Sequence, residues 1–398
     1  MDLEHRLERV GERRRVAQGG SRDLRSAVAR RIALVGLGLN SHTNPNLAAA
    51  LRRRFPGYSV EWIDVGPLVM NRKAVSLLLW GHATSEFSGK VGLNPRRLKS
   101  CRYWTTYLFK LRSLSAAREI AKKRYLFSIQ IQSTFDASVP GLPHFVYTDN
   151  TMLANLQYKT NRREDLPVTD KWIALEQLLY EKAKICFVMS RNVGRSLIED
   201  YGCAKDKVVC AYGGHNSPVR VNSKNKYDQK NILFVGVDWE RKGGPELLMA
   251  FRSVKKRVPE ARLTIVGCSP SISEPGCEVV GHVPLLSVGS YYANASVFCM
   301  PSRHEPFGIV FVEAMAHGLP VVATNIGAVP DLVTNGSNGF LVSPGDAQGL
   351  ADSLGRLLSD PPLCEEMGNR SRAAAQTYTW DNVASIMSGE IERIVRVG

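Results

Sequence analysis

Residues 297–346 read VFCMPSRHEPFGIVFVEAMAHGLPVVATNIGAVPDLVTNGSNGFLVSPGD. The apolar, β-branched run over residues 295–300 is typical of a buried parallel strand. The spacing of apolar residues over 309–317 predicts a helix, and Gly318 ends it. A second short strand is expected over residues 321–324. This strand–helix–strand order predicts an α/β unit, in which helices cover a parallel sheet.

Two acidic residues stand out in this stretch. Glu305 lies in the loop at the carboxyl end of the first strand, and Glu313 lies about two turns into the helix. Phe307, Gly308 and Ile309 form the start of that helix, whose free N–H groups suit a diphosphate. Ligands of open α/β sheets bind at the carboxyl ends of strands, and the two carboxylates there suit hydroxyl groups. A ligand that carries both kinds of group, such as a nucleotide-sugar, fits this pattern.

The whole run resembles a known family. Glu305-x7-Glu313, followed by Gly327-Ala-Val-Pro-Asp331 and Asn338-Gly-Phe-Leu-Val342, resembles the retaining glycosyltransferases of family 4, the group 1 glycosyltransferases. The resemblance implies that Glu305 contacts the transferred sugar and that Glu313 contacts the ribose hydroxyls. It also implies the GT-B fold, in which two doubly wound, Rossmann-like domains face each other across a cleft. An ordinary βαβ unit with exposed carboxylates is the alternative.

The chain has 398 residues, and strand–helix alternation occurs twice along it, which predicts two domains. The polar stretch between the two alternations is typical of a linker. The expected parts are a charged, partly disordered extension over 1–29, an N-terminal, acceptor-side Rossmann-like domain over 30–216, a linker over 217–230, a C-terminal, nucleotide-sugar-binding Rossmann-like domain over 231–380, and a C-terminal helix over 381–398. By resemblance, the last helix crosses back to the N-terminal domain.

The net charge of +15 is unevenly distributed. Residues 1–215 hold 35 basic and 19 acidic residues and carry +16, whereas residues 216–398 hold 17 and 18 and carry −1. Such asymmetry indicates that the N-terminal half faces something anionic. No run reaches the roughly 18 to 20 apolar residues of a membrane-spanning helix, and the charged start lacks the apolar core of a signal peptide. We therefore expect a cytoplasmic protein. Its eight scattered cysteines, with no Cys-x-x-Cys, are expected to be reduced thiols.

Two adjacent cations, Arg241 and Lys242, follow the strand expected over residues 232–235. A loop of this kind, placed just before a helix, suits a diphosphate. It resembles the phosphate-binding Arg/Lys pair of the family, although many members have an arginine where this chain has Val237. A solvated basic turn is the alternative. Because no Asp-x-Asp occurs, we expect no metal and no cofactor apart from the nucleotide-diphosphate-sugar donor. The cations and the helix dipole would then stabilise the leaving diphosphate.

Further ligand contacts follow from the resemblance. The backbone around Val283 would cradle the base. Gly36 and Gly38, after the first strand, form an incomplete dinucleotide fingerprint with no acidic residue clearly placed to bind an adenosine ribose. In the family this glycine loop faces the donor diphosphate. Asp149 follows another strand and is a candidate for binding or orienting the acceptor hydroxyl, or else for capping a helix. Thr148 stands where many members have a histidine.

The segment from Pro95 to Phe127 is strongly basic and aromatic. Ten of its residues are Lys or Arg, Glu119 is its one acid, and six aromatic residues lie among them. One interpretation is a surface that lies on an anionic membrane at its inner face, which suits a lipid-linked acceptor. The other is a basic helix folded onto the domain, with its aromatic residues in the core.

The expected function is that of a metal-independent, retaining hexosyltransferase-type enzyme. It moves a sugar from a nucleotide-diphosphate-sugar to an acceptor hydroxyl, on a sugar or a lipid-linked acceptor, in bacterial polysaccharide or glycolipid synthesis. A nucleotide-sugar epimerase of the same fold is one alternative. A nucleic-acid-binding protein that uses the basic half is another, but no nucleic-acid-binding signature is visible and we expect no such partner.

Overall fold

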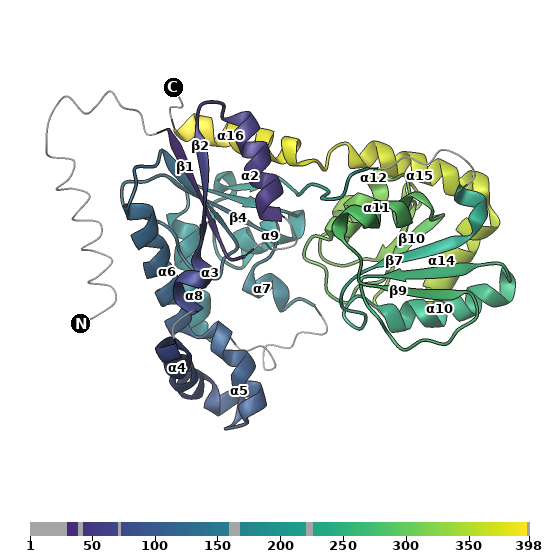
Figure 1. The fold of residues 1–398 in the computed structure, drawn as a ribbon, viewed down its shortest axis with the longest axis horizontal. Coiled ribbons are helices and arrows are strands. Elements are labelled where there is room, and N and C mark those ends of the chain that lie inside the picture. Colours follow the sequence, from purple (N-terminus) through teal and green to yellow (C-terminus); the bar gives the residue numbers. More distant parts are fainter. Residues whose placement is uncertain (1–29, 39–42, 71–72, 159–167, 220–225, 396–398) are drawn as a thin grey trace, which may run out of the picture. The chain divides into compact units, whose positions relative to one another are not determined.

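The chain folds into two compact units in the computed structural model, which describes residues 30–38, 43–70, 73–158, 168–219 and 226–395 (Figure 1). The first unit consists of three segments of the chain: Met1–Gln157, Asn161–Ala211 and Ala384–Gly398. The second takes Tyr158–Thr160 and Tyr212–Val383. The extension expected over residues 1–29 lies outside the described residues.

The first unit is built on a six-stranded sheet in which every pair of neighbours is parallel. Its strand order is β2-β1-β3-β4-β5-β6, so the order reverses between β1 and β3. The three strands β3, β4 and β5 are buried at every position, as expected for a sheet covered on both faces. The strands are β1 (Arg31–Gly36), β2 (Ser59–Asp64), β3 (Phe127–Ile131), β4 (His144–Thr148), β5 (Ile185–Val188) and β6 (Val208–Cys210).

Hydroxyl side chains begin several helices of the first unit. Thr105, Thr151, Thr169 and Ser190 each accept a bond from a backbone N–H in the first turn that follows. The helices are α2 (Thr43–Arg54), α3 (Val65–Met70), α4 (Lys73–Val91), α5 (Pro95–Cys101), η3 (Arg102–Trp104), α6 (Thr106–Ala121), α7 (Met152–Asn155), α8 (Asp170–Lys182), α9 (Arg191–Glu199) and η4 (Lys205–Lys207).

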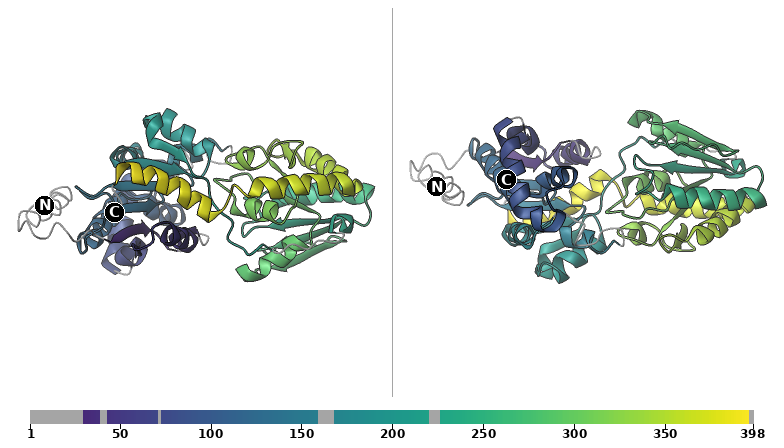
Figure 2. Two further views of the ribbon diagram at one scale, coloured as in Figure 1. Left: turned by 90° about the horizontal axis from the view of Figure 1, so that it is seen from above. Right: turned by 90° about the horizontal axis from the view of Figure 1, so that it is seen from below.

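The second unit has a second six-stranded parallel sheet, in the order β12-β11-β10-β7-β8-β9. Helices α10 and α14 lie together on one face, and α12 and α15 lie together on the other (Figures 1 and 2). Both units are therefore doubly wound α/β folds, as predicted. The strands are β7 (Asn231–Val235), β8 (Arg262–Val266), β9 (Cys277–Gly281), β10 (Val297–Met300), β11 (Val321–Thr324) and β12 (Gly339–Val342). The helices are η5 (Lys226–Gln229), α10 (Gly244–Arg257), α11 (Leu285–Ala293), α12 (Ile309–Ala316), α13 (Val329–Leu332), α14 (Ala347–Ser359) and α15 (Pro361–Ala375).

The final helix, α16 (Trp380–Ile394), begins in the second unit and continues in the first. From Ala384 onward it contributes to the first unit's core through Ala384, Met387 and Ile391, each at most 1% exposed. Arg54 Nε at the end of α2 donates to Ser388 Oγ at 2.9 Å. The first unit is thus completed by residues from the far end of the chain.

The boundary between the units falls between Ala211 and Tyr212, before the linker expected over 217–230. Part of that linker, residues 220–225, lies outside the described residues. Its later part belongs to the packing of the second unit, because Lys226 is 3% exposed and its ammonium donates to the carbonyl oxygen of His317 at 2.6 Å. Although the composition of residues 217–230 is polar, the part of this segment at Lys226 is therefore packed into the second unit through a buried cation.

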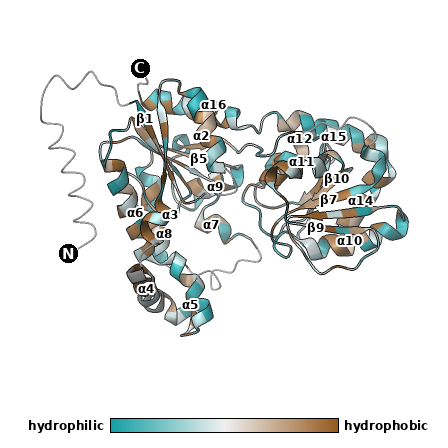
Figure 3. Ribbon diagram, viewed as in Figure 1, coloured by the Kyte–Doolittle hydropathy of each residue, from teal (hydrophilic) through white to brown (hydrophobic). Residues whose placement is uncertain are grey.

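Hydrophobic residues concentrate in the central strands of both sheets (Figure 3). All eight cysteines are free thiols, and four of them are buried. Within the described parts of the chain, no helix has both the length and the apolar character that crossing a membrane requires.

Candidate functional site

The strand order of the second sheet reverses between β7 and β10. Ligands of open α/β sheets bind at such a reversal, beyond the carboxyl ends of the strands. The loop over residues 236–243 follows β7, and the loop over 301–308 follows β10. The two loops contact each other through the backbone N–H of Arg303, which donates to the carbonyl oxygen of Arg241 at 2.9 Å. Gly243, at φ 75°, permits this approach because a Cβ there would clash with the carbonyl of Pro301.

A buried ion pair joins these loops. Lys242 Nζ lies 2.6 Å from Glu305 Oε2, and the two side chains are 12% and 3% exposed. Ser302 Oγ donates to the same carboxylate oxygen at 2.9 Å. Both of these bonds go to Oε2 of Glu305. The structure thus brings together two predicted site residues that are 63 positions apart in the sequence.

The second predicted cation, Arg241, is more exposed. Its Nε lies 3.2 Å from Asp238 Oδ2, and its Nη1 donates to the carbonyl oxygen of His304 at 3.4 Å. The backbone N–H of Arg241 and its guanidinium lower the pKa of Asp238. Each predicted phosphate-binding cation therefore already pairs with a carboxylate of the protein. A bound diphosphate would have to share the cation with that carboxylate.

The backbone of Glu305 is held as firmly as its side chain. Its carbonyl oxygen accepts the Tyr158 hydroxyl at 3.0 Å and the Ala328 N–H at 3.3 Å. Any Cβ at Gly327 would clash with the same oxygen. The sequence did not single out Tyr158 or Ser302, because neither belongs to a recognisable motif.

Helix α12 starts where it was predicted to start. Gly308 precedes it at φ 90°, in the left-handed region, and a Cβ there would lie 3.2 Å from Glu305 Cδ. The free N–H groups at Ile309 and the Glu305 carboxylate are therefore neighbours. Phe307 is 3% exposed, and its ring packs so closely on Gly213 that a Cβ there would lie 2.6 Å from it. Phe307 is consequently a packing residue of this loop.

Glu313 is buried and bonded by the protein itself. Its Oε1 accepts the backbone N–H groups of Asn216 at 3.2 Å and Ser217 at 3.0 Å, and its Oε2 accepts the Tyr292 hydroxyl at 3.1 Å. Burial raises the pKa of Glu313, and these hydrogen bonds oppose that rise. A carboxylate has about four acceptor positions, so a further donor can still bind. The carboxylate therefore anchors the segment after Gly214, whatever else it binds.

Backbone contacts also tie the loops after β7, β8 and β9 together. Gly236 N–H donates to the Val266 carbonyl at 2.9 Å, and Gly267 N–H donates to the Gly281 carbonyl at 2.8 Å. Val283 lies half-buried two residues beyond β9, just before α11. The predicted base-binding loop is thus attached to the same sheet edge as Lys242.

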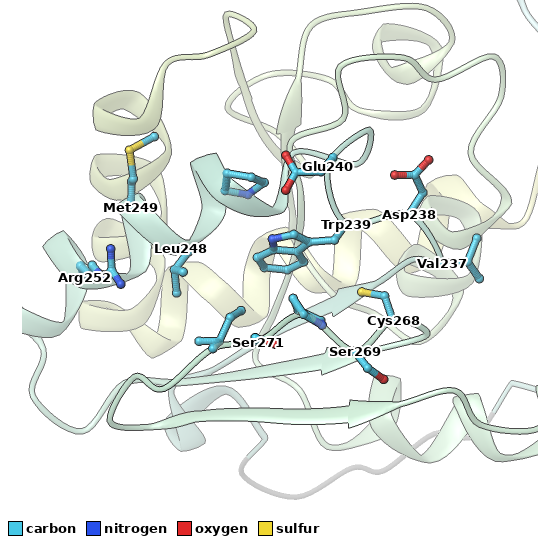
Figure 4. Close-up of a pocket in the computed structure, with 13 residues that line it drawn as sticks. Val237, Asp238, Trp239, Glu240, Leu248, Met249, Arg252, Cys268, Ser269 and Ser271 are labelled. Atoms are coloured by element: carbon cyan, nitrogen blue, oxygen red, sulfur yellow. The ribbon is translucent and has the colours of Figure 1, made fainter. Parts of the chain in front are cut away.

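A hollow of about 810 Å³ flanks this edge (Figure 4). Trp239 lies at its centre, between Leu248 on α10 and Cys268 in the loop after β8. Neither Lys242 nor Glu305 lines it. The loop after β7 nevertheless contributes Val237, Asp238, Trp239 and Glu240 to its lining, so the hollow adjoins the ion-paired loops.

The glycine turn of the first unit has an acidic neighbour. Asp64 Oδ1, at the end of β2, accepts the N–H groups of Gly38 at 3.2 Å and Gly66 at 2.9 Å. Gly36 is needed for packing, because a Cβ there would lie 2.6 Å from Trp62. From the sequence alone, no acidic residue was clearly placed to bind an adenosine ribose beside this turn. The parallel register that pairs Gly36 with Asp64 could have located it.

Asp149 lies half-buried after β4 and lines a cavity of about 120 Å³. It does not cap the following helix, because Thr151 Oγ1 accepts the Ala154 N–H at 3.0 Å as the N-cap of α7. Glu176, which the sequence analysis missed, lines the same cavity. It is fully buried and accepts hydrogen bonds from protein donors: Ser133 Oγ at 2.7 Å, Tyr180 OH at 2.9 Å, Met152 N–H and Tyr201 OH.

The predicted residues therefore form two groups, one in each unit. The second unit gathers Lys242, Arg241, Glu305 and the start of α12, while Gly36, Gly38 and Asp149 belong to the first. Among the residues that the structure describes, no three His, Cys, Asp or Glu side chains are grouped to hold a metal ion.

Comparison with known proteins identifies the second unit. Residues 218–374 match the family model described as glycosyl transferases group 1. The D-inositol 3-phosphate glycosyltransferase of Corynebacterium aurimucosum is 30% identical over 269 residues, which are 60% of this chain and 64% of that protein. The matches span only 41% to 64% of the length of four curated relatives, less than two thirds.

Solved structures show the fold. The sucrose-phosphate synthase of Thermosynechococcus elongatus, at 19% identity, gives a TM-score of 0.67 over 92% of this chain and 98% of that one. Anabaena HepE in complex with UDP and glucose, at 16% identity, gives a TM-score of 0.59 over 92% of this chain and 100% of that one. The two doubly wound units are those of the GT-B fold. Residues 218–374, in the second unit, are therefore similar to the group 1 glycosyl transferases.

Proposed function

We propose that the protein transfers a sugar from a nucleotide-diphosphate-sugar to an acceptor hydroxyl, with retention at the anomeric carbon. The observation that carries the proposal is the buried Lys242–Glu305 pair at the strand-order reversal of the second sheet. Glu305 would accept a sugar hydroxyl, and Glu313 would accept a ribose hydroxyl. The Val283 backbone would contact the base. Similarity to a structure that holds UDP and glucose supports a uridine diphosphate donor as the first to be tried.

The proposed reaction needs no protein nucleophile. The bond from the anomeric carbon to the diphosphate breaks, and the acceptor oxygen bonds to that carbon on the same face. The acceptor proton goes to an oxygen of the leaving phosphate. Lys242, Arg241 and the N–H groups at the start of α12 would stabilise the departing charge, as preorganised donors do. We propose that these groups replace a metal ion.

In the first unit, Asp149 would orient the acceptor hydroxyl. Gly38 fits the donor diphosphate less well than its motif indicated, because the carboxylate of Asp64 already occupies its N–H. We propose that the acceptor is a sugar or a lipid-linked sugar of bacterial polysaccharide or glycolipid synthesis, and that the enzyme works in the cytoplasm.

A panel of nucleotide-sugars tests this proposal. We expect a thermal shift and slow donor hydrolysis with one diphosphate donor, no shift with RNA or DNA oligomers, and activity that persists in EDTA. NMR of the product should show that the donor's anomeric configuration is retained. Conversion of the donor to its epimer without an acceptor would point to an epimerase, and a shift only with oligomers would overturn the enzyme.

We also propose that an anionic membrane is a partner of the first unit, through a surface other than the one its aromatic residues indicated. Phe109, Tyr125 and Phe127 are buried in the core, and only Tyr103 of the six aromatic residues is classed as exposed. The placement of these aromatic residues therefore agrees with the alternative interpretation, in which the basic segment folds onto the domain and its aromatic residues join the core.

The surface that does fit a membrane lies on α4, α5 and the turn between them. Leu77 and Leu93 are each 74% exposed, and Leu78 is 49% exposed. Arg96, Arg97 and Lys99 are exposed on α5, the helix that packs against α4. Exposed leucines with adjacent cations suit a bilayer surface of anionic lipid, where each cation contributes about 1 kcal/mol. We call this set of six residues the α4–α5 surface.

Vesicle sedimentation tests the α4–α5 surface. We expect binding to rise with anionic lipid and to fall with salt, and the Leu77→Asp/Leu78→Asp variant should bind about tenfold less because its apolar contact is lost. Leu286→Asp is the matched control, since Leu286 is 68% exposed in the second unit. Equal sedimentation of the unmodified protein with neutral and anionic vesicles would remove the membrane from the proposal.

A further inference from the structure

Glu176 on α8 is a fully buried carboxylate that the proposed reaction does not use. Its hydrogen bonds reach three other segments of the first unit. Ser133 Oγ, in the turn after β3, donates to Oε1 at 2.7 Å, and the backbone N–H of Met152, at the start of α7, donates to Oε2 at 3.2 Å. Tyr201 OH, which follows α9, donates to Oε2 as well. One carboxylate therefore joins the two loops that follow the neighbouring strands β3 and β4.

The short helix α7 depends on these contacts for its place. It has four residues, so the N–H groups of its first turn have no partner inside the helix. Met152 N–H donates to Glu176. Leu153 N–H donates to Tyr201 OH at 3.2 Å, and the same hydroxyl donates to Glu176. Asp149 lies three residues before α7, so the Glu176 carboxylate fixes the segment that carries it.

The turn after β3 holds a strained residue next to Ser133. Gln132 has φ 72°, in the left-handed region that residues other than glycine rarely adopt. Its N–H donates to the Tyr147 carbonyl at 3.0 Å, and its own carbonyl accepts Gln130 Nε2 at 2.7 Å. Such a conformation persists only where the surroundings fix it, and strained residues of this kind cluster at ligand sites. The bond from Ser133 to Glu176 is one of the contacts that fix this turn.

The two loops form part of the wall of the cavity of about 120 Å³ that Asp149 lines. We propose that Glu176 is a positioning residue for the acceptor, which holds the turn at Gln132 and the loop at Asp149 at the spacing that the acceptor hydroxyl requires. Four neutral protein donors fill the roughly four acceptor positions of the carboxylate, so it acts through these loops. The inference rests on the proposed function, in which Asp149 orients that hydroxyl.

Two tyrosine variants separate positioning from folding, because each removes one donor from the same carboxylate. Tyr201→Phe breaks the link between Glu176 and Leu153. Tyr180→Phe is the matched control, since Tyr180 OH donates to Glu176 at 2.9 Å from within α8. Both variants keep the edge-to-face contact between the two rings.

Amide hydrogen exchange over residues 149–155, read by mass spectrometry, measures the loop directly. We expect it to be about tenfold faster in Tyr201→Phe, because the first turn of α7 loses one hydrogen bond, and within about twofold of the unmodified protein in Tyr180→Phe. Since both variants lose one donor, their melting temperatures should fall by similar amounts.

Kinetics with UDP-glucose as donor, and with octyl glucoside, octyl galactoside and myo-inositol as acceptor probes, test the consequence for transfer. Tyr201→Phe should lower kcat/KM for the acceptor by up to about a hundredfold, as misplaced positioning groups do. The Kd for UDP should change by less than about twofold, because its proposed contacts lie in the second unit. Tyr180→Phe should change neither quantity.

Unchanged exchange over residues 149–155 in Tyr201→Phe would overturn the proposal, and so would an equal loss of kcat/KM in Tyr180→Phe. If the unmodified protein neither binds UDP-glucose nor transfers from it, the proposed function fails instead. Where no transfer is measurable, exchange over residues 149–155 alone decides whether Glu176 holds the loop at Asp149.

Discussion

Replacing Lys242 with alanine should lower turnover by about 10²- to 10³-fold, the usual effect of removing one preorganised donor from a developing oxyanion. The same change leaves Glu305, which is 3% exposed, as a buried carboxylate without its cation. Breaking a buried pair from one side costs roughly 3–5 kcal/mol, so the melting temperature should fall as well. Steady-state kinetics beside a melting curve measure both effects.

Two further variants separate charge stabilisation from folding. Lys256→Ala removes an exposed cation from α10 and should change neither quantity. Lys242→Met with Glu305→Gln removes both charges, so it should recover much of the lost stability while turnover stays low. Full turnover in Lys242→Ala, or recovery of turnover in the double variant, would contradict a role for Lys242 in diphosphate departure.

Glu313→Ala should weaken donor binding about tenfold to a hundredfold, because a hydrogen bond to a charged group is worth roughly 1.5 to 3 kcal/mol. The backbone N–H groups of Asn216 and Ser217 would lose their acceptor, so stability should fall too. Isothermal titration with the donor that the panel identifies measures the affinity.

Tyr292→Phe is the matched control for this prediction. It removes the hydroxyl that bonds Glu313 Oε2 but keeps the carboxylate and its two backbone donors. We expect a smaller loss of stability and donor affinity within about threefold of the unmodified protein. A folded Glu313→Ala protein with unchanged donor affinity would reduce Glu313 to the anchoring role that its protein partners already define.

The parts of the fold that could be predicted are those where local chemistry repeats. β10, α12 and β11 were predicted to within a residue or two, because an apolar β-branched run, a helical apolar period and Gly318 follow one another without interruption. Motif order, which is a longer-range signal, predicted the family of the second unit.

The contacts that decide the site could not be predicted in this way. The Lys242–Glu305 pair joins loops 63 positions apart, and each partner alone is an ordinary charged loop residue. Asp64 was overlooked beside Gly38 because its role depends on which strands are neighbours. The aromatic residues of the basic segment were ambiguous, since helical spacing does not say which face of α6 is covered. Leu77 attracted no attention, because exposure is not a property of composition.

The contribution of α16 to the first unit has a consequence for synthesis on the ribosome. Ala384, Met387 and Ile391 fill the core of the unit that begins at β1, yet they are translated after the second unit. A nascent chain therefore carries an incomplete first unit, with part of its core uncovered, while the residues between Tyr212 and Val383 emerge. The second unit can complete its sheet during elongation, as domains commonly do. The order in which the units become complete is then the reverse of the order in which they begin.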